Sequence, residues 1–203
     1  MRSWDDTRRA FADAAGWFVR TAALVGDRWD RPGLGEWDVR ALVGHTSRSL
    51  LTVEEYLARP AVAVEVGSAA DYYRAIRAVA AGPGVAERGR AAGAVLGADP
   101  ATAVAEIAVR VLAIVDAQDG DALVTTIAGG MRLADYLPTR TFELAVHTAD
   151  LATALGVPVD VPATAATQAL RVVADLAIGD GVAGPLLLAA TGRAGLPADF
   201  SVL

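Results

Sequence analysis

Apolar residues recur along this chain at alternating intervals of three and four, the period of a helix that is buried on one face. In the segment over about residues 6–25, this apolar stripe consists of Phe11, Ala15, Phe18, Ala22 and Val25. Similar stripes run over about residues 39–57, 100–115, 133–155 and 163–178. Long amphipathic helices must bury their apolar faces against one another, so the pattern predicts a helical bundle.

Capping residues mark the ends of several of these segments. Asp38 and Asp99 stand where two of the long helices begin, and a carboxylate at that position accepts hydrogen bonds from the first free amides. Pro100 follows Asp99 and suits a first helical position. Gly156 comes directly after the helix over 133–155, where glycine readily forms a left-handed cap. These capping residues therefore support the helix boundaries that the apolar stripes predict.

Shorter elements complete the predicted fold. Helices are expected over about residues 68–80 and 85–96, separated by Gly82-Pro83-Gly84, and a short β-like run over 123–127. We expect the apolar tail from Gly184 onward to pack back on the body. The predicted fold is thus mainly α, a four-helix bundle with additional helices and little sheet, in a single domain over residues 1–203.

Composition excludes several classes of protein. The chain contains no cysteine, which rules out a disulfide framework and a thiolate metal site. Its net charge of -6 leaves no basic stripe for nucleic acid. No apolar run reaches the ~18 residues of a transmembrane helix, so no membrane association is expected. The charged N-terminus does not resemble a signal peptide, and a cytoplasmic location is expected.

The chain has only two histidines, His45 and His147, and Glu143 precedes His147 by one helical turn. Two imidazoles and one carboxylate form a familiar open site for zinc, and nickel or another metal that prefers nitrogen and oxygen is also compatible. Asp150, one turn further on, is a candidate to orient His147 or to act as a fourth ligand. The residues alone also allow a solvated Glu143–His147 pair, worth about 0.3 kcal/mol.

Three segments resemble, in order, landmarks of the mycothiol-dependent maleylpyruvate isomerase family, which is part of the DinB-like superfamily. The segments are Gly35–His45, Arg140–Leu151 and Leu188–Arg193. The resemblance implies a DinB-like four-helix bundle. It also implies one zinc ion bound by the two histidines and Glu143, with water in the open position.

The resemblance further implies mycothiol, or a similar small thiol, as a cosubstrate that the metal activates. A coordinated thiol loses its proton at neutral pH, and the thiolate is the nucleophile. Arg140, one turn before Glu143, is a candidate to orient an anionic substrate group or to pair with an acid. The isomerase that names the family carries a further C-terminal domain, for which this chain leaves little room. Thiol transfer is therefore expected in preference to maleylpyruvate isomerisation itself.

The sequence thus predicts a metal-dependent enzyme that activates a small thiol for transfer to, or isomerisation of, a small electrophile. The alternative is a non-catalytic metal-binding bundle with a structural, sensing or interaction role. The two differ in whether the metal keeps an open coordination position. Trp37, Tyr72 and Tyr73 are expected to serve mainly in packing, and Arg193 in structure.

Overall fold

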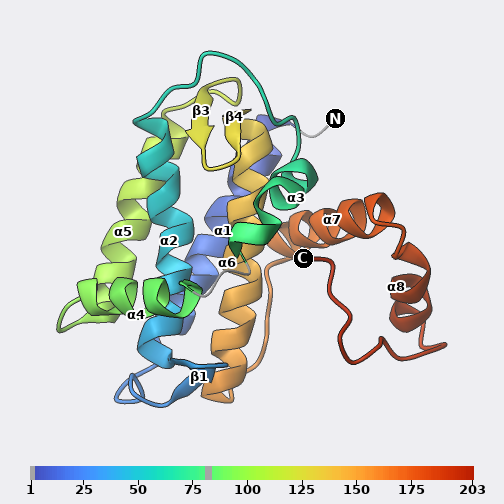
Figure 1. Ribbon diagram of the computed structural model, residues 1–203. Coiled ribbons are helices and arrows are strands. Elements are labelled where there is room, and N and C mark those ends of the chain that lie inside the picture. The colour runs from blue at the N-terminus through green and yellow to red at the C-terminus, as the bar shows by residue number, and fades with distance from the viewer. Residues whose placement is uncertain (1–2, 81–83) are drawn as a thin grey trace.

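The computed structural model describes residues 3–80 and 84–203, which form a mainly α-helical molecule (Figure 1). Its helices are α1 (Trp4–Ala23), α2 (Val39–Leu57), α3 (Ala69–Ala80), α4 (Val85–Val95), α5 (Pro100–Asp116), α6 (Leu133–Leu155), α7 (Ala163–Gly179) and α8 (Ala183–Ala190). Two short antiparallel pairs join them, β1 (Pro32–Leu34) with β2 (Trp37–Asp38) and β3 (Leu123–Thr126) with β4 (Gly129–Arg132). The predicted mainly α fold with little sheet is confirmed.

Four long helices, α1, α2, α5 and α6, form the bundle (Figure 1). Both α1 and α2 pack against α5 and α6, and the predicted apolar stripes meet between them. The fully buried side chains at the centre include Phe11, Phe18, Leu42, Leu50, Leu137, Leu144 and Leu151. None of the described helices is both long and apolar enough to cross a membrane.

The predicted helix caps are present. The Asp38 carboxylate accepts a hydrogen bond from the Ala41 amide at 2.7 Å, and Asp99 accepts one from Thr102 at 3.1 Å. Gly156 adopts a φ of 67°, the left-handed conformation that ends α6. The boundary predicted at Gly82-Pro83 lies outside the described residues.

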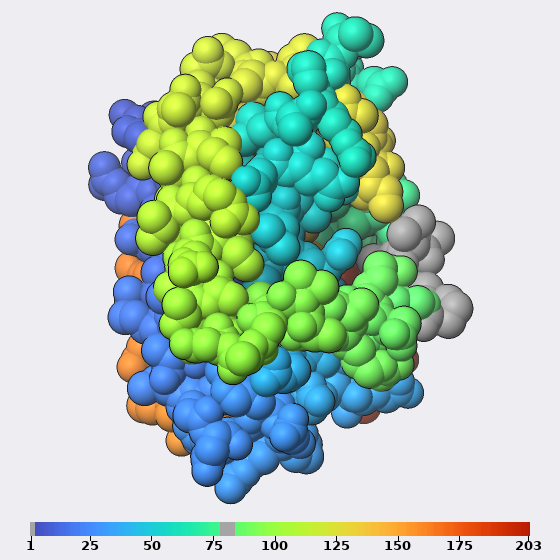
Figure 2. Space-filling view, turned by 90° about the vertical axis from the view of Figure 1, so that its left-hand side faces the viewer, coloured from blue at the N-terminus to red at the C-terminus, as the bar shows by residue number. Residues whose placement is uncertain are grey.

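Helix α4 crosses α2 at very close range. A Cβ atom on Gly44 of α2 would lie 2.1 Å from the backbone nitrogen of Gly93 in α4. A Cβ atom on Gly89, one turn earlier in α4, would lie 2.6 Å from the Trp37 ring. Only glycine allows this approach, which brings α4 next to His45. In Figure 2, α4 (green) crosses this face above the blue segment that leads into α2.

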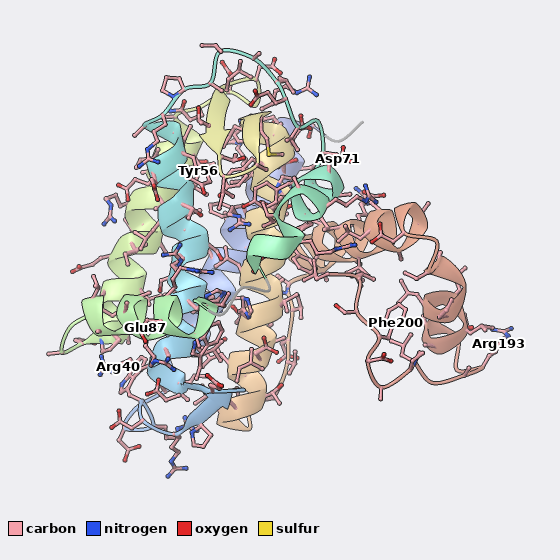
Figure 3. The ribbon with its side chains drawn as sticks, in the orientation of Figure 1. Arg40, Tyr56, Asp71, Glu87, Arg193 and Phe200 are labelled. Carbon is pink, nitrogen blue, oxygen red and sulfur yellow. The ribbon has the colours of Figure 1, made fainter. Side chains whose placement is uncertain are left out.

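The C-terminal arm, residues 180–203, differs from the prediction. Helix α8 has no buried residue, and Leu187 is 65% exposed. Figure 3 shows the arm projecting from the bundle, with Arg193 and Phe200 on it. The expectation that the whole tail packs back is therefore wrong for α8, and holds only near the end of the chain, where Val202 packs against the core.

No helix was predicted in the tail from Gly184 onward. Pro185 lies in the first turn of α8, where its missing amide hydrogen would have no helical partner anyway. The apolar residues of α8 are consecutive and form no single face that could dock on the bundle. The apolar composition of α8 therefore predicted burial, but the helix has no single apolar face that could be buried against the bundle.

Candidate metal centre

His45 from α2 and the pair Glu143 and His147 from α6 converge at one point between these helices. One potential ligand atom from each of the three lies within 4.8 Å of the others. The centroids of the two imidazole rings are 4.8 Å apart. His45 lies to one side of the apolar stripe of α2, yet the packing of α2 against α6 brings it to the same place. Nitrogen and oxygen donors at this spacing fit one divalent ion after small side-chain rotations.

Asp150 contacts His147 on the side of the ring opposite Glu143. The His147 Nδ1 atom lies 3.1 Å from Asp150 Oδ2, while its Nε2 atom lies 3.3 Å from Glu143 Oε2. Because Asp150 bonds the nitrogen that faces away from the cluster, its geometry fits an orienting carboxylate and not a fourth ligand. Burial by itself would lower the pKa of His147, but the hydrogen bonds to Asp150 and Glu143 outweigh it and raise the pKa to about 9.

His45 is held by an aromatic neighbour and has an unsatisfied nitrogen. The Trp37 ring packs on the His45 ring with centroids 4.4 Å apart, and the Trp37 Nε1 group donates to the carbonyl of Ala86 in α4. The His45 Nδ1 atom is buried without a hydrogen-bond partner among the described residues. Burial, with the nearby charge of His147, lowers the pKa of His45 to about 4. The ring is therefore neutral at pH 7, the form that binds metals.

Glu143 is half-buried and ionised. Burial alone would raise the pKa of Glu143, but the hydrogen bond from His147 and the charge of Arg140 outweigh it and lower the pKa to about 2. Its two oxygens have different partners, since Oε1 accepts from the Tyr73 hydroxyl at 2.8 Å and Oε2 faces His147. The ionised carboxylate and the neutral His45 ring are donors that suit zinc, and His147 would join them on giving up its proton to the metal.

A cavity of about 630 Å³ opens beside the three candidate ligands and is lined by residues of α2, α3, α4 and α6. Figure 2 shows the surface hollowed between α4 and the part of α2 above it. Arg140 lines this cavity and is only 8% exposed. Its guanidinium carbon lies 5.5 Å from the centre of the Tyr72 ring and 5.2 Å from that of Tyr136. Between these rings the cation is shielded from water.

Arg140 makes no ion pair with a carboxylate within the described part of the chain. Its Nε atom donates to Thr139 Oγ1 at 2.9 Å. Burial would lower the pKa of Arg140, but the neighbouring tyrosines and Glu143 raise it above its ordinary value. A charged guanidinium thus lines the cavity close to the candidate centre.

The site contains aromatic residues that the sequence placed only in packing roles. The chain's four tyrosines, which are Tyr56, Tyr72, Tyr73 and Tyr136, contact one another in a series beside the cavity. Tyr72 and Tyr73 do pack in the core as expected, but Tyr73 also reaches Glu143. The adjacent Tyr72 and Tyr73 on one predicted helix were visible in the sequence. The packing of α3 against α6, which brings Tyr73 to Glu143, could not be predicted from a local pattern.

Comparison with known proteins agrees with this geometry. The family model of the mycothiol maleylpyruvate isomerase N-terminal domain matches residues 4–152. This span contains the three candidate ligands but not the Leu188–Arg193 landmark, which lies on the exposed arm (Figure 3). No curated protein and no solved structure matches the chain. Since the matched span covers well over half of the sequence, the chain belongs to the mycothiol maleylpyruvate isomerase N-terminal domain family.

Proposed function

We propose that this chain, as one domain over residues 1–203, is a metal-dependent enzyme that activates a small thiol such as mycothiol. The activated thiol serves the transfer or isomerisation of a small electrophile. One observation carries the proposal, which is the convergence of His45, Glu143 and His147 at the wall of a cavity of about 630 Å³. The chain belongs to the mycothiol maleylpyruvate isomerase N-terminal domain family, and this membership supports a small thiol as the cosubstrate. Zinc is the metal that best suits this donor set.

Each residue at the centre would have its own role in metal binding. His45, Glu143 and His147 would hold the ion, and Asp150 would keep Nδ1 of His147 protonated so that Nε2 faces the centre. When bound, a divalent metal lowers the pKa of a coordinated thiol and so supplies a thiolate. Because the chain contains no cysteine, the reactive sulfur must belong to an external molecule.

The electrophile would be anionic and oriented by Arg140. Among the described residues that line the cavity, Glu143 is the acidic side chain, whereas Arg48, Arg88 and Arg140 supply positive charge and Arg77 pairs with Asp180 outside the lining. This contrasts with the net charge of -6 for the whole chain. A buried guanidinium with no carboxylate partner of its own is suited to paired hydrogen bonds with an acid group of the substrate.

The test is to replace zinc with cobalt and to add mycothiol. We expect a sulfur-to-cobalt charge-transfer band in the near ultraviolet. S-methyl mycothiol, which has the same size but no free thiol, is the matched control and should produce no such band. If the spectrum stays unchanged at millimolar mycothiol while cobalt remains bound, thiol activation is wrong. The non-catalytic metal-binding protein then becomes the better interpretation, because it requires the same ligands but no exchangeable position.

A further inference from the structure

The Tyr73 hydroxyl contacts one oxygen of Glu143. It donates to Oε1 at 2.8 Å, with the carbonyl oxygen of Thr139 at 3.0 Å as a second acceptor. The other oxygen, Oε2, lies 3.3 Å from Nε2 of His147. The hydrogen bond to Oε1 therefore leaves Oε2 as the oxygen that points toward the two histidines.

This contact restricts a side chain that would otherwise have several rotamers. A Glu side chain has three rotatable bonds, and only some of their combinations direct an oxygen at the centre. A hydroxyl that donates to a carboxylate makes one of the stronger hydrogen bonds in proteins, and Tyr73 is only 5% exposed, so water competes little. Burial, together with the charge of Glu143, raises the pKa of Tyr73 well above its ordinary value. The hydroxyl hence remains a donor at neutral pH.

Helix α3, which carries Tyr73, is fixed in place by the end of α7. Arg74 Nε lies 3.1 Å from Asp180 Oδ1, and Arg77 pairs with the other oxygen of Asp180. A Cβ atom on Gly179 would lie 1.8 Å from the Arg74 guanidinium, so this group lies directly against the helix backbone. Gly179 and Asp180 lie outside the span that the family model matches. The C-terminal part of the chain thus contacts the helix that carries Tyr73.

We propose that Tyr73 is a positioning residue for Glu143, and that the Asp180 contacts hold α3 where Tyr73 can act. The inference rests on the proposed metal centre and adds to it a residue that determines how tightly the ion is held. Groups that hydrogen-bond metal ligands typically change metal affinity by about 10- to 100-fold when they are removed.

Tyr73→Phe tests the role, because it removes the hydroxyl and keeps the ring packed on Phe142, whose centroid is 5.4 Å away. Tyr56→Phe is the matched control. Tyr56, labelled in Figure 3, also lines the cavity, but its hydroxyl makes no hydrogen bond in the part of the chain that the structure describes. With chelator competition on the full chain, we expect zinc affinity to fall about 10- to 100-fold in Tyr73→Phe and to be unchanged in Tyr56→Phe.

A second readout separates positioning from a general structural role. At saturating cobalt, the visible absorption bands of Tyr73→Phe should differ from those of the wild type in position and intensity, because the carboxylate relaxes. Those of Tyr56→Phe should superimpose on the wild type. Wild-type affinity and spectrum in Tyr73→Phe, or an equal loss in Tyr56→Phe, would overturn the inference and leave the metal centre standing. If the wild type itself binds neither zinc nor cobalt, both proposals are wrong.

Asp180→Asn is the second variant, and it does not disturb the core because the Asp180 side chain lies at the surface. It should weaken zinc binding in the same direction as Tyr73→Phe but by a smaller factor, since it loosens α3 without removing the hydroxyl. This result would support the inference even if Tyr73→Phe failed to fold. Unchanged zinc affinity in Asp180→Asn would overturn the proposed support from α7.

Discussion

The bundle and the C-terminal arm are both rich in leucine and alanine, yet they differ completely in burial. Leu144 and Leu151 of α6 have no exposed surface, whereas Leu187 and Leu188 of α8 are 65% and 46% exposed. In α6 the leucines repeat at helical spacing and form one face, while in α8 they are consecutive. Burial therefore follows from the pattern of apolar residues and from the neighbours available, and not from composition alone.

The two regions also differ in their relation to the candidate centre. All three candidate ligands lie in the bundle, within the residues that the family model matches. The arm reaches the site through Leu203, which lines the cavity, and it contacts α3 through Asp180 and through the carbonyl oxygen of Val202. Substitutions in the two regions should therefore have different effects on metal binding and on stability.

The largest effect is expected from His147→Ala in the bundle. Removing one of three ligands should weaken zinc binding by more than about 100-fold, beyond the loss typical of an orienting partner. Elemental analysis after dialysis should find zinc in the wild type and none in the variant. Leu188→Ala in the arm is the comparison and should retain zinc. Loss of zinc from both variants would mean that α8 contributes to metal binding.

Leucine truncation measures the contrast directly. Leu144→Ala should lower the free energy of unfolding by about 2–5 kcal/mol, because it leaves a cavity in a packed core. Leu187→Ala should change it by less than about 0.5 kcal/mol, as is usual for exposed positions. Urea denaturation followed by circular dichroism gives both values. Equal losses would show that α8 is covered in solution.

The close crossing of α2 and α4 should resist even one added methyl group. Gly44→Ala places a carbon 2.1 Å from the Gly93 nitrogen, and the overpacking should cost about 1–3 kcal/mol of unfolding free energy. Gly67→Ala is the control, because a Cβ atom there meets nothing within 4 Å. A thermal melt compares the two variants. The same melting temperature in both would contradict the close approach.

The smallest effect is expected from Asp150→Asn, which keeps the shape of the side chain and removes its charge. The His147 imidazole would lose a charged partner at Nδ1, and zinc affinity should fall by about 10-fold. Competition with a chelator of known affinity measures the change. A loss as large as that of His147→Ala would indicate that Asp150 binds the metal itself.

Much of the fold could be predicted because its determinants are local. The stripe of α1, the Asp38 and Asp99 caps and the left-handed Gly156 each depend on residues within one or two turns. The pairing of Glu143 with His147 is local in the same sense, since residues four apart share a helix face. The exposed α8 was beyond reach, because burial depends on what another part of the chain presents.

The long helices, several of their ends and the candidate donors His45, Glu143 and His147 could be read from the sequence alone. The convergence of these donors within 4.8 Å of one another depends on how α2 packs against α6. The hydrogen bond from Tyr73 to Glu143, 70 positions later, likewise depends on how the helices pack. The difference lies in the range of the interactions. Hydrogen bonds within a helix and the period of a stripe act between near neighbours, whereas contacts between helices form only when the whole set of apolar faces packs together.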